Sequence, residues 1–217
     1  MKPFTRRFTA QMFALKRKIV PLTMTWLSLG LLCAGCISRP RLAKEFFALR
    51  PPPPRDTSLI SSTNVLAIKP VTVSPLFEGK SFVYRTGEHS FEQDAYADFL
   101  VSPSRALEIP IRAYLRQAGL FREVVEPGSA LRPDHIAEFS FTELYGDFRQ
   151  PEDTAAVMSV HFILIEDGVA RSLVTQKNCT RRVRLKARTA AALVDAWNQA
   201  LDEIMGEIVD ALKRVKQ

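Results

Sequence analysis

The sequence has few residues of the kinds that usually carry catalysis or bind metal ions. It contains three cysteines and three histidines in 217 residues. The histidines, His89, His135 and His161, stand far apart. A structural zinc site needs about four nitrogen or sulfur ligands at short paired spacings, so zinc is not indicated. The motifs G-x-S-x-G, H-E-x-x-H, G-x-G-x-x-G and the Walker A loop are absent, and we expect neither a cofactor nor an enzyme activity.

A single C-x-x-C, formed by Cys33 and Cys36, is open to more than one interpretation. In a thioredoxin-like redox site, this motif lies where a strand of a βαβ unit meets a helix. Here it ends an uncharged, largely apolar run over residues 19–34, which disfavours a redox site. Cys179 is the one cysteine elsewhere in the sequence, so a framework of structural disulfides is excluded.

Acidic residues are missing from residues 1–35, which carry the basic residues Lys2, Arg6, Arg7, Lys16, Arg17 and Lys18. The formal net charge of +7 and the sequence pI of about 9.5 therefore come mostly from this segment. The rest of the chain is nearly neutral, which is not typical of a nucleic-acid-binding protein. We expect no nucleic acid as a partner.

The same segment has the order of a secretory signal: basic residues, an apolar run, then the small residues Ala34 and Gly35. Residues 33–36, CAGC, resemble the bacterial lipobox, which implies cleavage between Gly35 and Cys36 and attachment of lipid to the Cys36 thiol. Several acyl chains would then hold the protein on a membrane. Ile37 stands where inner-membrane retention signals have Asp, which indicates the outer membrane with the body in the periplasm. The alternative is an uncleaved anchor in the inner membrane.

This pattern divides the chain into three parts. Residues 1–35 are expected to be a lipoprotein signal peptide. Residues 36–63 are expected to be the lipidated cysteine and a tether rich in proline and serine, because Pro51–Pro54 favours a semi-rigid polyproline II spacer. The apolar island at 45–50 is either a first edge strand or part of this tether. Residues 64–217 are expected to form the folded domain.

Alternating apolar residues predict strands at 65–73, 135–148, 155–168 and 170–187, and two short strands around the T-G-E-H turn at 86–89. Pro70 indicates an edge or a bulge in the first of them. Apolar spacing predicts a helix over residues 102–121, with Ser102 as its cap, Gly119 at its end, and Pro110 either kinking it or delaying its start.

A second helix is predicted from about Thr189 to Arg214, because an apolar stripe recurs there at helical spacing. Its members are Leu193, Trp197, Leu201, Ile204, Ile208 and Leu212. The order strands, helix, strands, helix predicts an α/β (α+β) fold. We expect a single domain with a largely antiparallel mixed sheet and two main helices packed on one face of it.

Two groups of charged residues are candidate sites. Arg181, Arg182, Arg184 and Lys186 crowd one predicted strand and are candidates for contact with lipid headgroups or an acidic partner; an ordinary solvated strand face is the alternative. Glu138, Glu143 and Asp147 lie close in sequence. Glu138 and Asp147 would face opposite sides of a regular strand, and no nucleophile, base and orienting group come together.

The ordered set of motifs from residue 36 to about residue 215 resembles the ABC-type transport auxiliary lipoprotein family, of the paraquat-inducible protein C type. After Cys36 come FFALRPPP, then IKPVTVSPLFEGKSFVYR, which is similar to the family's Pro-Val strand and its VYR segment. The stretch from DAYADFLVSPS to VVEPGS, then ELYGDF and the closing AAALVDAWNQALDEIMGEIVDAL, complete the order.

This resemblance implies an α/β domain and a non-enzymatic role in a lipid transport system. The protein would dock a periplasmic MCE-domain protein and, through it, an ABC permease and ATPase. Phospholipid would pass between the membranes, and a homo-oligomer would suit such a dock. Alternatives are a lipoprotein activator of cell-wall synthesis, an outer-membrane assembly factor, and a periplasmic enzyme.

Overall fold

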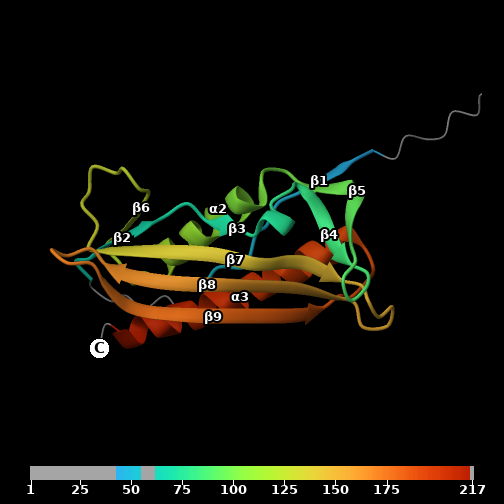
Figure 1. Cartoon of the computed structure of the whole chain (residues 1–217). Coiled ribbons are helices and arrows are strands. Elements are labelled where there is room, and N and C mark those ends of the chain that lie inside the picture. Colours follow the sequence, from blue (N-terminus) through green and yellow to red (C-terminus); the bar gives the residue numbers. More distant parts are fainter. Residues whose placement is uncertain (1–42, 55–61, 216–217) are drawn as a thin grey trace, which may run out of the picture. The chain divides into compact units, whose positions relative to one another are not determined.

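A long strand, β7 (His135–Asp147), joins the parts of the sheet to one another (Figure 1). The structure is a computed structural model that describes residues 43–54 and 62–215. All of these residues belong to one compact unit that begins at Ala43. On one side β7 pairs along its whole length with a single strand, and on the other side it pairs with several short ones.

The full-length partner of β7 is β8 (Ala155–Glu166), and β8 in turn pairs with β9 (Ser172–Arg184). Both pairings are antiparallel. Every second residue of β8 is buried on one face, as the alternation in the sequence predicts. The residues on this face are Ala156, Met158, Val160, Phe162 and Leu164.

Short strands pair with two different parts of the opposite edge of β7. Near its start lie β2 (Val65–Ile68) and β3 (Thr72–Val73), and near its end lies β4 (Ser81–Arg85), all of them parallel to β7. The strand β4 continues antiparallel into β5 (Phe91–Phe99). The sheet is therefore mixed, and most of its paired residues lie in the antiparallel ladders.

Two edge strands complete the nine-stranded sheet in the described residues. One is β1 (Glu45–Phe47), which pairs parallel with β5, and the other is β6 (Glu123–Val125), which pairs parallel with β2. From the sequence, residues 45–50 could be either an edge strand or part of the tether. In the structure Glu45–Phe47 form the strand β1, and Leu49 after it is buried in the core. The strand β6 was not predicted, because three residues are too few to show an alternation.

Pro70 lies between β2 and β3, where the expected irregularity is found. Ile68 is opposite Ala137 and Thr72 is opposite Ser140, so the β2–β3 segment contains one more residue than the matching part of β7. A proline has no backbone N–H to donate to the ladder, and the extra residue places it outside the pairing.

Helix α2 (Pro103–Gln117) begins directly after Ser102 and contains Pro110 in its interior. The proline therefore does not delay the start of the helix. Gly119 has φ 68°, a left-handed conformation that glycine adopts without strain, and the helix ends just before it. The short 3-10 turn η1 (Pro75–Phe77) precedes β4.

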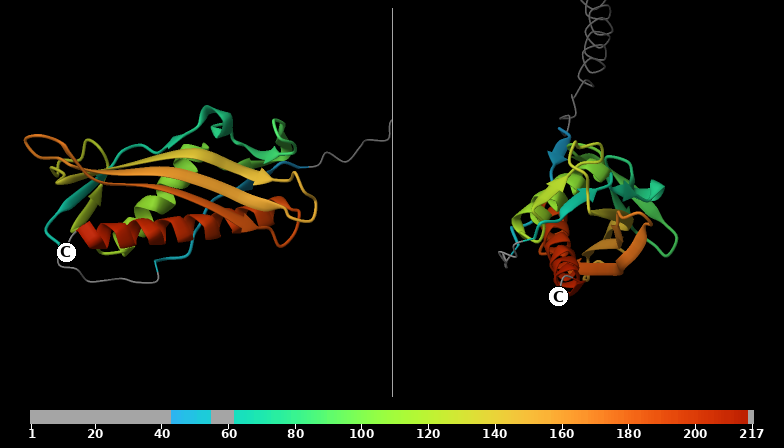
Figure 2. Two further views of the ribbon diagram at one scale, coloured as in Figure 1. Left: turned by 60° about the horizontal axis from the view of Figure 1, so that its bottom comes forward. Right: turned by 90° about the vertical axis from the view of Figure 1, so that its left-hand side faces the viewer.

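Helix α3 (Ala190–Val215) lies along β8 and β9, and the six residues of its predicted stripe are all buried. Both helices lie on the same side of the sheet (Figure 2, left). The prediction of a mixed α/β fold with two helices, one of them long and C-terminal, is confirmed. The aromatic end of the core is built around Trp197, whose ring stacks on Phe99 at 5.4 Å and meets Phe82 edge-on at 5.1 Å.

Candidate functional site

The predicted lipid attachment site, Cys36, and the predicted cleavage point after Gly35 lie outside the described residues. Lipidation therefore stays a prediction from the sequence. The same holds for the signal peptide assigned to residues 1–35.

The four basic residues predicted as a contact site do not form one patch. Side chains alternate along a strand, so Arg181 points to the α3 side of β9 while Arg182 and Arg184 point to the opposite side. Lys186 lies beyond the end of β9 and is exposed. The alternation of the strand thus separates residues that are neighbours in sequence.

On the α3 side, Arg181 connects β9 to the helix. Its Nη2 lies 2.8 Å from Oε2 of Glu207, and its Nε lies 3.3 Å from Oε2 of Glu203. The hydrogen bond from Arg181 lowers the pKa of Glu207, against the opposing effect of burial. Burial raises the pKa of the neighbouring Cys179 thiol, which favours the neutral, unreactive thiol.

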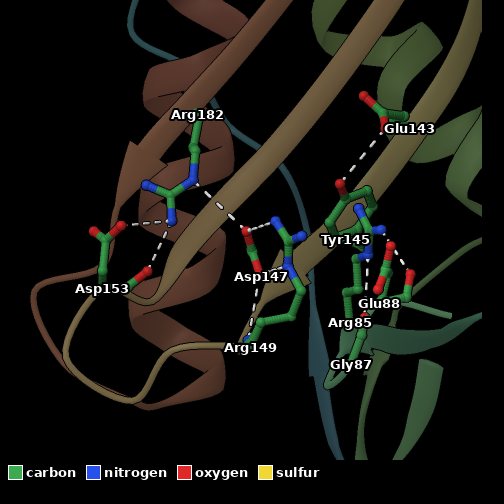
Figure 3. Close-up of polar contacts among 9 residues, drawn as sticks. All are labelled: Arg85, Gly87, Glu88, Glu143, Tyr145, Asp147, Arg149, Asp153 and Arg182. Carbon is green, nitrogen blue, oxygen red and sulfur yellow. Dashed lines mark hydrogen bonds and ion pairs between the residues drawn. The ribbon is translucent and has the colours of Figure 1, made fainter. Parts of the chain in front are cut away.

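A polar cluster lies on the opposite side of the sheet, at the end of β7 (Figure 3). We call Asp147, Arg149, Asp153 and Arg182 the Asp147 cluster. Asp147 is 4% exposed and accepts hydrogen bonds from Nε and Nη2 of Arg149 at 2.9 and 2.8 Å. Arg182 lies between two carboxylates, with Nη2 2.9 Å from Oδ2 of Asp153 and Nε 3.7 Å from Oδ2 of Asp147.

The electrostatics of the Asp147 cluster favour its charged form. The hydrogen bond from the Arg149 side chain lowers the pKa of Asp147, and the charge of Arg182 adds to this, while burial acts in the opposite direction. The Asp147 carboxylate in turn raises the pKa of Arg149. Two arginines and two aspartates compensate one another, so the cluster has no excess charge with which to attract an anionic headgroup.

A bulge in β7 gives Asp147 this position. Between Phe141 and Glu143 the register of β7 on β8 shifts by one residue, at Thr142. The shift places Glu138, opposite Ile163, and Asp147, opposite Ala155, on the same side of the sheet, because Ile163 and Ala155 share a face of β8. The expectation that Glu138 and Asp147 face opposite sides is therefore wrong, since it assumed a regular strand.

Glu143 belongs to a second, smaller hydrogen-bonded group on this side of the sheet. The Ser159 hydroxyl donates to Oε2 of Glu143 and lies 2.9 Å from the Thr180 hydroxyl. The Tyr145 hydroxyl contacts Oε1 of Glu143 at 3.5 Å (Figure 3). This group connects β7, β8 and β9 side by side, and each hydroxyl has a partner.

Aromatic residues cover the sheet beside this group. The Tyr145 ring stacks on Phe77 of η1 at 5.6 Å and meets Phe91 edge-on at 5.7 Å. Arg85 lies over the Phe91 ring at 5.8 Å, and its Nη2 donates to the carbonyl oxygen of Glu88 at 2.7 Å. The guanidinium of Arg85 thereby holds the turn between β4 and β5 against the sheet (Figure 3).

The geometry of these groups suits structure and binding better than bond-making chemistry. A nucleophilic serine needs an adjacent general base. His161, two residues beyond Ser159, instead contacts Oδ1 of Asn178 through its Nδ1. Within residues 43–54 and 62–215, no group of three or more His, Cys, Asp or Glu side chains is arranged to hold a metal ion.

A shallow, largely apolar groove lies between the segment Leu49–Pro53 and helix α2. Its volume is about 350 Å³, and α2 contributes Ile109, Pro110 and Ala113 to it. The segment is held in place because the backbone N–H of Arg50 donates to Oδ1 of Asn198 on α3 at 2.7 Å. Sequence reasoning missed this groove, since it treated the prolines as part of a free spacer.

Sequence reasoning also missed the Asp147 cluster as a unit. Arg149 and Asp153 lie in the R-Q-P-E-D-T stretch, whose proline and acidic residues between two strong strands are a turn signal. That signal predicts the β7–β8 hairpin, which brings Asp147 and Asp153 near one another. The position of Arg182 beside Asp147 and Asp153 depends on the register of β9 on β8, which the sequence pattern does not determine.

None of the helices formed by the described residues has the length and apolar character needed to cross a bilayer.

Comparison with solved structures reveals the same fold in other proteins. A protein from Xanthomonas campestris superimposes with a TM-score of 0.68 at 14% identity, over 76% of this chain and 92% of its own. An uncharacterised protein superimposes with a TM-score of 0.62 at 15% identity, over 78% of this chain and 99% of its own. A hypothetical protein from Chlamydia trachomatis superimposes with a TM-score of 0.50 at 11% identity, over 70% of this chain and 98% of its own. At these identities the likeness concerns the fold.

No curated protein matches the chain in sequence. A family model does match it: the model of the ABC-type transport auxiliary lipoprotein component covers residues 47–209. The match begins within β1 and ends within α3, so it spans nearly all of the described fold. The resemblance inferred from the sequence is therefore confirmed, and the chain belongs to the family of ABC-type transport auxiliary lipoprotein components.

Proposed function

We propose that this protein is anchored by lipid to the outer membrane, faces the periplasm, and docks a periplasmic MCE-domain protein. In this role it serves an ABC-type system that moves lipid, in our proposal phospholipid, between the two membranes. The protein contributes a binding surface, and ATP hydrolysis belongs to another subunit. The chain's membership of a transport auxiliary lipoprotein family is the observation that carries this proposal.

The lipobox-like sequence supports the anchored part of the proposal. Cys36 precedes the matched region, which begins at residue 47, by a short stretch. Ile37 supports export to the outer membrane. The net charge of the chain falls almost entirely before Cys36, so removal of the signal leaves a nearly neutral body.

The start of the compact unit adds a constraint on this anchored state. The compact unit begins at Ala43, so residues 37–42 alone connect it to Cys36. At ~3.5 Å per residue, a fully extended connection of this length spans at most about 25 Å. The body would therefore stay close to the membrane surface, whereas a spacer reaching to residue 63 would let it range much farther.

A pair of matched cysteine variants tests the anchoring. Cys36→Ala should remove acylation, release the body into the periplasmic fraction and impair transport of lipid. Cys33→Ala, three residues earlier, should leave acylation, membrane fractionation and lipid transport unchanged, because Cys33 is removed with the signal peptide. A Cys36→Ala protein that still fractionated with the outer membrane and supported full transport would overturn the anchored role.

Crosslinking tests the docking. Membranes crosslinked before solubilisation should yield this protein together with an MCE-domain protein. A second candidate, activation of cell-wall synthesis or assembly of the outer membrane, predicts a penicillin-binding protein or an assembly complex in its place. Recovery of either instead of an MCE-domain protein would overturn the proposed partner.

A further inference from the structure

The strand β9 is a long, free edge of the sheet. It pairs with β8 alone, and no other strand in the described part of the chain lies along its second side. Between Thr175 and Arg184 its register on β8 is unbroken, and this run contains neither proline nor glycine. Proteins block edge strands with proline, bulges, short length or charged side chains, and of these four this run shows only charged side chains.

An edge of this kind offers regularly spaced hydrogen-bonding groups. In an antiparallel ladder, every second residue directs its N–H and C=O toward the neighbouring strand, and the residues between direct theirs away. The residues of β9 that do not bond to β8 therefore present their backbone groups outward. Such groups accept an added strand, whose own backbone then supplies the missing partners.

The side chains along this edge select the charge of an added strand. Residues 172–188 contain six basic residues and no acidic residue. Arg181, Arg182 and Arg184 have carboxylate partners within the domain. In the part of the chain that the structure describes, no ion pair joins Lys177 or Lys186 to a carboxylate, although the charge of Lys177 contributes to the lowered pKa of Glu207. These two lysines lie near the two ends of the regular run and leave it with excess positive charge.

The α3 side of this edge has space for a side chain. A hollow of about 60 Å³ lies where the end of β9 approaches the helix, between Val183 and Lys186 on one wall and Ala192, Asp195 and Gln199 on the other, so the side chain that enters it is an uncharged one. An added strand directs every second side chain toward α3. One small side chain of that strand fits this hollow.

From these observations we propose that the edge Thr175–Arg184 binds an extended, acidic segment of a partner protein by strand addition. The segment pairs through its backbone with β9, and its carboxylates meet Lys177 and Lys186. The segment contains no proline along the length that pairs with β9, because proline would remove a ladder hydrogen bond.

Selection from a random library tests this proposal without knowledge of the partner. The mature full-length protein, held in detergent micelles, is used to select from displayed random ten-residue peptides. The selected peptides should be rich in Asp and Glu, contain β-branched residues, and lack proline. On binding, such a peptide should slow hydrogen exchange at alternate backbone amides between Thr175 and Arg184.

Two changes separate strand addition from other binding. Methylation of alternate backbone nitrogens of a selected peptide should abolish binding in one of the two registers and spare it in the other. The variant Lys177→Gln/Lys186→Gln should bind the peptide about fivefold more weakly, as expected for two exposed ion pairs. The matched control Arg132→Gln removes an exposed charge from the loop before β7 and should leave the affinity unchanged.

Several outcomes would overturn the proposal. They are a library that yields no acidic peptides, protection that falls on β6 or β1 instead of β9, and equal affinity for the lysine double variant. If the lysines of this edge serve only to prevent aggregation, the library should yield no acidic peptides. The assay needs neither the lipid anchor nor the transport system, so its failure leaves the proposed docking of an MCE-domain protein to its own test.

Discussion

Asp147 and Arg149 are two positions apart, yet the guanidinium of Arg149 folds back to donate two hydrogen bonds to the Asp147 carboxylate. The backbone N–H of Arg149 also contacts Oδ1 of Asp147, at 3.3 Å. The chain turns out of β7 at this point, and the carboxylate holds the turn. Arg182 approaches the same carboxylate from β9, so one buried side chain connects β7, β9 and the loop that follows β7.

The first prediction concerns this carboxylate. Asp147→Asn should lower the free energy of unfolding at pH 7 by about 2 kcal/mol, because it removes the charge from buried hydrogen bonds. The pKa of Asp147 is lowered in the folded state, so its contribution is present above the unfolded pKa of about 4 and is lost as the pH falls through the folded pKa. Urea unfolding of both proteins at pH 7 and pH 3 should show a difference that shrinks in acid. Asp153→Asn, whose carboxylate is 45% exposed, should cost less than about 1 kcal/mol.

The second prediction concerns Gly146, which faces α3 between Tyr84 and Phe148. A Cβ at this position would lie 2.9 Å from Cε2 of Phe148 and 3.0 Å from Cδ1 of Tyr84. Gly146→Ala should therefore reduce the free energy of unfolding by about 1–3 kcal/mol through overpacking. Gly79→Ala is the control, since the nearest atom to its Cβ is 3.9 Å away. Equal thermal midpoints for the two variants would contradict the tight packing at Gly146.

The third prediction concerns Trp197, which is fully buried among Phe82 and Phe99. Trp197→Ala should cost about 3–5 kcal/mol in chemical denaturation, because it leaves a cavity where the sheet meets α3. Trp197→Phe keeps an aromatic ring and should cost much less. If both replacements were equally mild, Trp197 would not be central to this end of the core.

The fourth prediction concerns Tyr84, whose hydroxyl donates to Oδ2 of Asp94 at 2.6 Å. Burial raises the pKa of Tyr84 well above its usual value of 10, and the hydrogen bond to Asp94 adds to this. The proton is held more tightly in the folded state, so the stabilisation is present below pH 10 and is lost as the pH rises through the folded pKa.

Tyr84→Phe should therefore lose about 1 kcal/mol at neutral pH and show a shallower loss of stability in alkali. Ultraviolet titration of the folded protein should lack one late-ionising tyrosine in this variant. Tyr96→Phe is the control, because Tyr96 is 52% exposed. A Tyr84→Phe protein with the same alkaline profile as the unchanged chain would contradict the link between Tyr84 and Asp94.

Sequence patterns predicted the parts of the fold that are built from neighbours in the chain. The strands β7, β8 and β9 are long and alternating, and the stripe of α3 is continuous, so their identity and their buried faces followed from periodicity. Pro70 marked an irregularity for the same local reason. In contrast, β2 pairs with β7 across a long separation, as Leu66 opposite His135 shows, and no local pattern specifies such a partner.

The candidate sites divide along the same line. The alternation of β9 was enough to separate Arg181 from Arg182, although the sequence analysis grouped them. The alternation could not predict their carboxylate partners. Glu207 lies in α3, and the position of Asp153 depends on the β7–β8 turn. The bulge at Thr142 was also invisible, because nothing in the composition of β7 distinguishes it from a regular strand.

From the arrangement of short strands along β7 we expect the β7–β8 and β8–β9 hairpins to form before the short strands pair. The hairpins β7–β8 and β8–β9 close short loops, whereas β3 pairs with β7 alone and has no other strand to pair with in the described residues. The β1–β5–β4 and β2–β6 parts of the sheet are joined to one another only through β7. A chain that ended before residue 135 would hold two separate fragments of sheet without β7 to join them, and only α2 to cover their apolar faces. Completion of the first half of the protein therefore awaits the second half, and a truncated product would be a substrate for proteases.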